Sequence, residues 1–228
     1  MPMRLLAIDT SAAHCSAALL VDGALTQRLA PASRRHGELI LGMMDELLGA
    51  AGLHAADLDA FAFAHGPGSF TGLRIAAAVV QGAALAAEKP VVGVSTLAAL
   101  AQGCHRAGGA SRVLCALDAR MGEVYAGAYA VDAPDGLARA LSPDRVCAPS
   151  AVVAPGPGPW AAAGSGWAVY ADALRAACGC EPVSLEPERP CEAQDVAILA
   201  AAAFAAGDIL DPADAVPVYL RDRVTSTG

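Results

Sequence analysis

Apolar and polar residues follow two different periods along the first fifty residues, one typical of strands and one typical of helices. Residues 4–8 and 15–21 are short apolar runs, and Asp22-Gly23 is a typical tight turn of a β-hairpin. From Gly37 to Ala50 the apolar residues recur on one broad helical stripe. This pattern predicts three antiparallel strands followed by a helix.

The next segments alternate between strand and helix. Residues 60–64 form a continuous apolar run that predicts a buried strand, and the small residues of 75–87 predict a helix. Residues 90–94 predict another buried strand, and Ser95 is a suitable N-cap for a helix that extends to about Gln102. The predicted order is therefore βββ-α-β-α-β-α.

The opening pattern recurs after residues 103–111, where three glycines interrupt it and predict a domain boundary. Residues 113–118 repeat the pattern of residues 5–9, and the two runs end in Asp118 and Asp9. An internal duplication of one α/β unit explains this repetition. The alternative is a chance similarity between two generic strand–turn–strand units.

The duplication predicts an N-terminal α/β domain over residues 1–105 and a smaller, degenerate C-terminal α/β domain over residues 106–228. The second half is less regular, because several of its segments are rich in proline and glycine. We expect loops over 132–159, a glycine turn at 164–167, a helix over 168–177, extended chain over 181–190, a helix over 192–206 and an extended end over 217–221.

Composition limits the kinds of function that are compatible with the chain. It has 228 residues, is 55% hydrophobic and carries a formal net charge of −8. An acidic chain without a basic stripe is a poor independent binder of nucleic acid, so contact with RNA would be indirect. Seven cysteines without a C-x-x-C pair indicate reduced thiols, and no apolar run is long enough for a membrane span. We expect a cytoplasmic protein.

A glycine-rich string, His65-Gly66-Pro67-Gly68-Ser69-Phe70-Thr71-Gly72-Leu73-Arg74, joins the second buried strand to the second helix, and we name residues 65–72 the glycine loop. Strand, glycine turn and helix N-terminus together favour anion binding. However, the spacing matches neither a P-loop, nor a dinucleotide fingerprint, nor a nucleophile elbow. The alternative is a tight turn that lets the helix pack close to the sheet.

Two βββαβαβα units with an acidic residue at the end of the first strand are the plan of the actin-like (ribonuclease H-like) ATPase fold. Four strings go further: Ile8-Asp9-Thr10-Ser11, the glycine loop with Leu73-Arg74, residues 89–95, and Tyr219-Leu220-Arg221. Together these strings resemble the TsaB (YeaZ) family, closely over residues 4–105 and diffusely afterwards.

The resemblance implies a role in forming N6-threonylcarbamoyladenosine at position 37 of tRNAs that read codons starting with A. In that pathway TsaD transfers the threonylcarbamoyl group, TsaB holds TsaD in an active heterodimer, and the small ATPase TsaE joins them. The resemblance also implies a TsaB homodimer when TsaD is absent. No cofactor is expected for this chain.

The resemblance further implies that the chain is not itself the transferase. TsaD-like proteins carry a His-x-x-x-His metal pair, and the matching positions here are Thr96 and Leu100. The alkyl side chain of Leu100 has no lone pair to donate to a metal. We therefore predict no catalytic residues and no metal site.

Other polar residues have a functional and a structural interpretation. Asp9 and Ser11 stand where actin-like ATPases bind nucleotide and Mg²⁺, but an aspartate at a strand end commonly caps a turn. His65 and Ser69 are compatible with a base and a nucleophile, although a hydrogen-bonded structural role fits each of them better. Arg74 is better suited to pair with a carboxylate or a partner than to catalysis.

A partner surface on the first two helices is the hypothesis that the resemblance favours. In the family these helices form a bundle with TsaD or with a second TsaB. The alternative is that both helices only pack on their own sheet. The residues expected at or near the interface are His36, Ile40, Met43, Met44, Leu47, Arg74, Ala78 and Gln81.

Two classes of function remain open at this point. One is a catalytically silent partner subunit, and the other is an autonomous enzyme. The enzyme would be an ATP-dependent kinase of the actin-like fold, or a glycoprotease-like hydrolase that uses His65 and Ser69.

Overall fold

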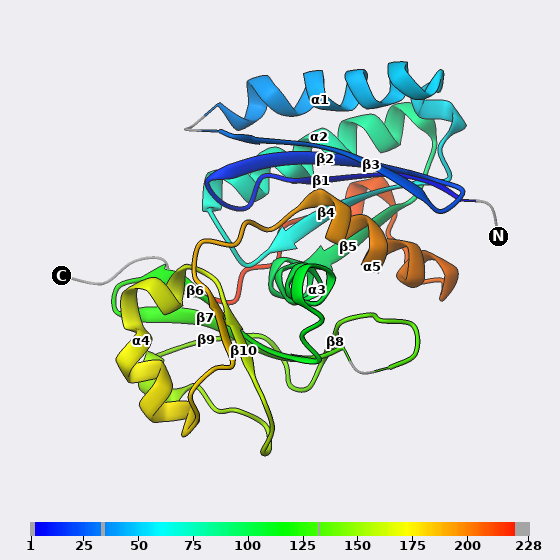
Figure 1. Ribbon diagram of the computed structural model, residues 1–228. Helices are drawn as coiled ribbons and strands as arrows, with labels where there is room; N and C mark the ends of the chain where they lie inside the picture. Colours follow the sequence, from blue (N-terminus) through cyan, green and yellow to red (C-terminus); the bar gives the residue numbers. More distant parts are fainter. Residues whose placement is uncertain (1–2, 33–34, 132, 222–228) are drawn as a thin grey trace.

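The computed structural model describes residues 3–32, 35–131 and 133–221, which form two lobes, each built on one β-sheet (Figure 1). The first sheet has the order β3-β2-β1-β4-β5. Its antiparallel hairpin strands and its parallel β1, β4 and β5 agree with the prediction. The strands are β1 (Arg4–Asp9), β2 (His14–Val21), β3 (Ala24–Pro31), β4 (Ala60–Gly66) and β5 (Val91–Ser95).

Helices cover both faces of this first sheet. The helices α1 (His36–Ala51) and α2 (Phe70–Ala87) pack on one face, and α5 (Ala193–Ala205) packs on the other (Figure 1). The helix α2 begins five residues earlier than predicted, because Ser69 caps its N-terminus. Among the described residues α2 alone is long and apolar enough to cross a membrane, but one side of it belongs to the core of this lobe.

The second sheet repeats the plan of the first, but its strands after β7 are only two or three residues long. Its order is β11-β10-β6-β7-β8, with β9 also paired to β7. As in the first sheet, the leading strand pairs antiparallel with the next strand and parallel with a later one. The strands are β6 (Arg112–Arg120), β7 (Glu123–Ala130), β8 (Arg139–Ala140), β9 (Arg145–Cys147), β10 (Ala161–Ala163) and β11 (Ser184–Glu186). The duplication predicted from the sequence is thus present in the structure.

The second unit is reduced in its helices. Between β9 and β10 it has the short 3₁₀ helix η2 (Pro149–Ala151), where the first unit has α1. The helix α4 (Ser165–Cys178) follows β10 at the predicted glycine turn, and Trp160 and Trp167 fill the core beneath it. The second sheet therefore has a smaller core than the first.

The helix α3 (Thr96–Gly108) packs against the second sheet, so the two units exchange their last helices. The predicted interruption of this helix at Gly103 is wrong, because α3 continues to Gly108 and ends at Gly109. A Cβ at Gly103 would lie 2.9 Å from Oδ2 of Asp195 on α5. The glycine therefore permits close approach of α3 and α5 instead of ending the helix.

The end of the chain returns to the first lobe. After α5, Leu210 forms an isolated bridge with Val91, and the 3₁₀ helix η3 (Pro212–Asp214) packs along α2. A short 3₁₀ helix, η1 (Ala55–Asp57), connects α1 to β4. We name residues 215–221 the C-terminal segment; it passes over the glycine loop and reaches β7 of the second lobe.

Candidate functional site

The glycine loop packs directly on the end of β1. A Cβ at Gly72 would lie 1.9 Å from the carbonyl oxygen of Thr10, and a Cβ at Gly68 would lie 2.6 Å from that of Ser11. The Ser69 N–H donates to the Ser11 carbonyl at 2.7 Å, and the Thr10 hydroxyl donates to the Gly72 carbonyl at 2.7 Å. Glycine is thus required where two backbones touch, and the tight-turn interpretation of this string is confirmed.

Ser69 has a structural role in this loop. Its Oγ accepts a hydrogen bond from the N–H of Gly72 at 3.3 Å and caps α2. The peptide bond between Gly66 and Pro67 is cis, and Gly66 has a φ of 129°. A Cβ at Gly66 would lie 2.6 Å from the carbonyl oxygen of Val218, so the C-terminal segment also depends on a glycine here.

His65 lies near the end of β4 and contacts the C-terminal segment. Its carbonyl oxygen accepts the N–H of Val218 at 2.8 Å, and its ring packs edge-on against Phe63. Burial lowers the pKa of His65, so the imidazole is neutral near pH 7. In the part of the chain that the structure describes, no hydrogen bond joins His65 to Ser69. The structure therefore does not assemble a base and a nucleophile from these two residues.

Asp9 and Ser11 are enclosed under the glycine loop. Asp9 is fully buried and Ser11 is 2% exposed. Oδ1 of Asp9 accepts the N–H of Ser11 at 3.1 Å, whereas Oδ2 of Asp9 and Oγ of Ser11 have no hydrogen-bond partner among the described residues. Burial raises the pKa of Asp9 to about 6, although Ser11 and the nearby thiol of Cys191 oppose the shift. A carboxyl so enclosed is not presented to a nucleotide or its Mg²⁺.

The positions that match the metal pair of TsaD-like proteins lie in the core. Thr96 and Leu100 are each 1% exposed, and Leu100 packs with Val113 and Tyr129 of the second sheet. Within residues 3–32, 35–131 and 133–221, no group of three or more His, Cys, Asp or Glu side chains is placed to hold a metal ion. The start of α3 therefore offers packing surface where a transferase would need ligands.

A polar cluster beside the start of α3 joins the two lobes. Ser95 caps α3 as predicted, since its Oγ accepts the N–H groups of Leu97 and Ala98. The same hydroxyl donates to Oδ2 of Asp144 at 2.6 Å, and the Tyr129 hydroxyl donates to Oδ1 of Asp144 at 2.5 Å. Sequence analysis missed Asp144, because it lies in an irregular loop with no recognisable spacing.

The apolar stripe of α1 faces the chain's own sheet. Ile40, Met43, Met44 and Leu47 all belong to the core beneath α1 and α2, and none of them is more than 9% exposed. These four side chains pack on β1, β2 and β4, as expected if α1 packs on its own sheet, and their place at or near a partner interface stays a prediction.

The outward sides of α1 and α2 form a separate surface. Leu41 on α1 and Leu85 on α2 are 54% and 70% exposed, and Ala78 is also exposed. His36 binds the Ala12 carbonyl through Nε2 at 2.7 Å, and Nε2 of Gln81 donates to the Ala213 carbonyl at 3.4 Å. We name the outward sides of α1 and α2 the helical face.

Two sequence motifs meet at one end of the helical face. The ring of Phe70 lies 5.7 Å from the ring of Tyr219, and the guanidinium of Arg74 lies 3.8 Å above the Phe70 ring. Nε of Arg74 donates to the Tyr219 hydroxyl at 3.0 Å. Arg221 then pairs with Glu123 on β7. The glycine-rich string and the terminal Tyr-Leu-Arg string are thus in direct contact.

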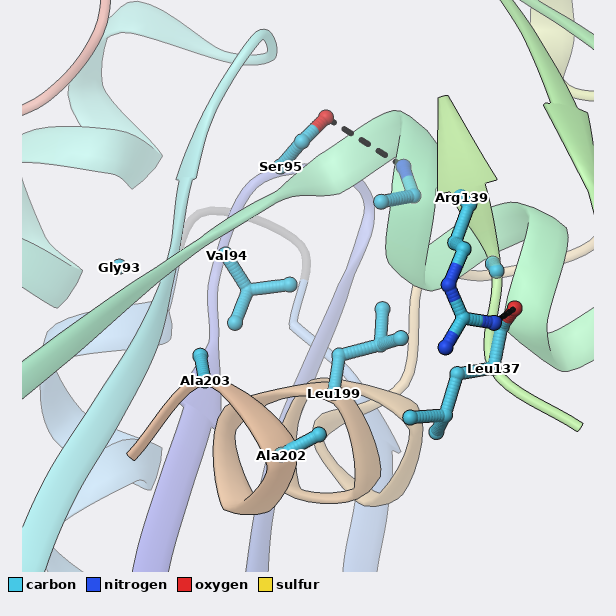
Figure 2. A pocket seen from close by; sticks show the side chains of 10 residues that line it. Gly93, Val94, Ser95, Leu137, Arg139, Leu199, Ala202 and Ala203 are labelled. Atoms are coloured by element: carbon cyan, nitrogen blue, oxygen red, sulfur yellow. Dashed lines mark hydrogen bonds between the residues drawn. The ribbon is translucent and has the colours of Figure 1, made fainter. Parts of the chain in front are cut away.

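A shallow hollow of about 310 Å³ lies between β5, α5 and residues 137–139 (Figure 2). Its walls are mainly apolar, with Leu137 and Leu199 facing each other. The polar side chains on it have partners, since Ser95 caps α3 and Arg139 pairs with Asp135. The hollow does not bring together a set of catalytic groups.

The order and directions of the strands in both sheets are those of the actin-like, ribonuclease H-like class of α/β proteins. The family described as "TsaD: tRNA N6-adenosine threonylcarbamoyltransferase" matches residues 30–184. The tRNA threonylcarbamoyladenosine biosynthesis protein TsaB of Escherichia coli (strain K12) is 40% identical over 225 residues, which cover 97% of this chain and 96% of that protein. The chain belongs to the TsaB (YeaZ) family.

Other relatives agree with this assignment. The structure of YeaZ from Pseudomonas aeruginosa superposes with a TM-score of 0.89 at 41% identity, covering 96% of this chain and 100% of that one. The tRNA N6-adenosine threonylcarbamoyltransferase of Kosmotoga olearia is 32% identical over 111 residues, or 42% of this chain and 34% of that enzyme. The chain is thus a threonylcarbamoyladenosine biosynthesis protein and a paralogue of the TsaD transferase.

Proposed function

We propose that this protein is a non-catalytic partner subunit that supports a TsaD-like transferase. The reaction it serves is the formation of N6-threonylcarbamoyladenosine at position 37 of tRNAs that read codons starting with A. The chain contacts tRNA only indirectly and works in the cytoplasm with a TsaE-like ATPase. It pairs with a second copy of itself when the transferase is absent.

The main support for this proposal is that α3 lacks metal-ligating side chains at the positions of the metal pair. The matching positions for a His-x-x-x-His pair hold Thr96 and Leu100, both of which are buried, and Leu100 packs against the second sheet. A leucine cannot ligate a metal, and in the part of the chain that the structure describes no group of three or more His, Cys, Asp or Glu side chains is placed to form a site. The enclosed position of Asp9 beneath the glycine loop supports the same conclusion.

The helical face is the surface proposed to bind the transferase. It exposes the apolar Leu41 and Leu85, and the small side chain of Ala78 allows a neighbouring helix to approach closely. His36, Arg74 and Gln81 stand at its borders. The four buried stripe residues support these helices from beneath and do not contribute contact surface.

Reconstitution of the tRNA modification tests the proposal. Purified TsaD-like transferase and TsaE-like ATPase from the same organism are assayed on tRNA with and without this chain. We expect modification only when the chain is present. Full activity without it would overturn the proposal.

Titration of the isolated chain with Mg-ATP tests the enzymatic alternative. We expect no binding in the micromolar range, since Asp9 and Ser11 are enclosed. Micromolar binding followed by substrate turnover would support an autonomous kinase instead, and hydrolysis of peptide substrates would support a hydrolase.

A further inference from the structure

Arg74 is held in one orientation by two aromatic side chains. Phe70 lies beneath its guanidinium at 3.8 Å, and the Tyr219 hydroxyl accepts its Nε–H at 3.0 Å. Phe70 lies on α2 with Arg74, whereas Tyr219 lies 145 residues from Arg74 in the sequence. An arginine side chain normally loses considerable rotamer freedom when it binds a ligand, and here that freedom is already restricted.

The outer edge of the guanidinium remains available. Tyr219 uses Nε, so the N–H groups on Nη1 and Nη2 keep the forked arrangement that matches a carboxylate. Arg74 is exposed, and no carboxylate in the described part of the chain forms an ion pair with it. This differs from the ion pairs that Arg28, Arg106, Arg175 and Arg221 form within the chain.

We propose that Arg74 is a preorganised anchor for a carboxylate side chain of the transferase subunit, and that Phe70 and Tyr219 are its positioning residues. This inference rests on the proposed function. The anchor lies at the end of the helical face, where half-exposed aromatic rings of Phe70 and Tyr219 add apolar contact area around the charge. Arginine and tyrosine surrounded by apolar contacts are typical of interface hot spots.

The charge of the site favours a protein occupant over RNA. Aromatic rings beside an arginine also suit a stacked base, but phosphate binding needs several cations. Within the described residues of this corner, Arg221 is already paired with Glu123, and the chain as a whole has a net charge of −8. A single unpaired guanidinium suits one carboxylate better than a nucleic-acid backbone.

The test measures the affinity of this chain for the purified TsaD-like transferase of the same organism at low and high salt. Four single variants are compared with the wild type: Arg74→Gln, Arg74→Lys, Tyr219→Phe and, as a control, Arg175→Gln on α4. We expect Arg74→Gln to weaken binding about 30-fold, which corresponds to loss of a hot spot. Arg74→Lys keeps the charge but loses the fork, so about tenfold is expected.

Tyr219→Phe keeps the ring and removes the hydroxyl, and we expect binding about threefold to tenfold weaker. The same change in the Arg74→Gln background should have no further effect, because Tyr219 acts through Arg74. The salt dependence of binding should also decrease in Arg74→Gln. Arg175→Gln should bind like the wild type.

The outcomes separate this inference from the function on which it rests. If the wild-type chain does not bind the transferase, both are overturned. If it binds and the Arg74 variants bind equally well, only the anchor is overturned. Unchanged transferase binding with weakened tRNA binding by the assembled complex would assign Arg74 to RNA instead, and would also overturn the anchor.

Discussion

Thr10 and Gly72 contact each other across 62 positions of sequence, with the Thr10 hydroxyl bonded to the Gly72 carbonyl at 2.7 Å. The same contact leaves no room for a side chain on Gly72, whose Cβ would lie 1.9 Å from the Thr10 carbonyl oxygen. The end of β1 and the start of α2 are therefore fitted to each other through their backbones. This fit explains why residue 72 is a glycine, and the explanation does not require a bound phosphate.

Gly72→Ala should destabilise the protein. The added methyl group must displace α2 or the end of β1, and overpacking of this kind costs about 1–3 kcal/mol or more. Chemical denaturation measures the change in the free energy of unfolding. Gly42→Ala is a matched control, because Gly42 is exposed on α1 with nothing within 4 Å of its Cβ position.

In that control we expect a gain of up to about 1 kcal/mol from the better helix propensity of alanine. Equal stability of Gly72→Ala and the wild type would show that the loop tolerates a side chain, against the geometry described above.

Asp9 should make the stability of the protein depend on pH. Burial raises its pKa from 3.8 to about 6 in the folded chain, so the folded state holds this proton more tightly than the unfolded state. The contribution is favourable at low pH and is lost as pH rises from about 4 through 6. At about 1.4 kcal/mol per pKa unit, the total loss is roughly 3 kcal/mol.

Asp9→Asn removes this titration while keeping the shape of the side chain. Denaturation at several pH values between 4 and 8 should give a flatter profile for Asp9→Asn than for the wild type. Asp45→Asn, at an exposed position on α1, controls for the loss of one carboxyl. Parallel profiles for Asp9→Asn and the wild type would contradict the assignment.

The hydrophobic pattern predicted the fold well, because the positions of helices and strands depend on local periodicity in the sequence. The hairpin at Asp22-Gly23, the cap at Ser95 and the second copy of the strand pattern at residues 113–118 are all present. The helix end predicted at Gly103 is wrong, since a helical glycine that makes room for Asp195 has the same local sequence signal as a helix end.

The site was harder to predict, because it depends on contacts between distant segments. The width of the α1 stripe did not reveal how much of it is covered. The core that α1 and α2 share with the first sheet contains all of Ile40, Met43, Met44 and Leu47. Nor did the terminal string reveal that Tyr219 lies against Phe70 and Arg74. Periodicity specifies which residues share a helix face, but it does not specify how much of that face the sheet covers.

Tyr129→Phe should weaken the connection between the two lobes. Its hydroxyl donates to the half-buried carboxylate of Asp144 at 2.5 Å, and removing a donor from such a group costs about 1–3 kcal/mol. Burial raises the pKa of Asp144, while the hydrogen bonds from Ser95 and Tyr129 lower it. The variant should therefore raise this pKa further and lose more stability at pH 8 than at pH 4, as measured by denaturation.

Tyr125→Phe on the same strand is the control, because the Tyr125 hydroxyl has no hydrogen-bond partner among the described residues. A loss of stability in Tyr129→Phe that does not increase with pH would mean that the hydroxyl does not stabilise the Asp144 carboxylate.

Met43 and Leu41 distinguish the core of α1 from its outward side. Met43→Glu places a carboxylate in the core, where an unpaired charge costs several kcal/mol, and should leave little folded protein by circular dichroism. Leu41→Glu changes a residue that is 54% exposed, so its melting temperature should stay close to that of the wild type. Its binding to the TsaD-like transferase should fall at least about tenfold, because the charge is desolvated in an apolar contact. Val169→Glu, at an equally exposed position on α4, should leave binding unchanged. If Met43→Glu folds well and loses binding, the buried stripe of α1 contributes to the interface after all. If Leu41→Glu binds normally, the interface does not lie on the helical face.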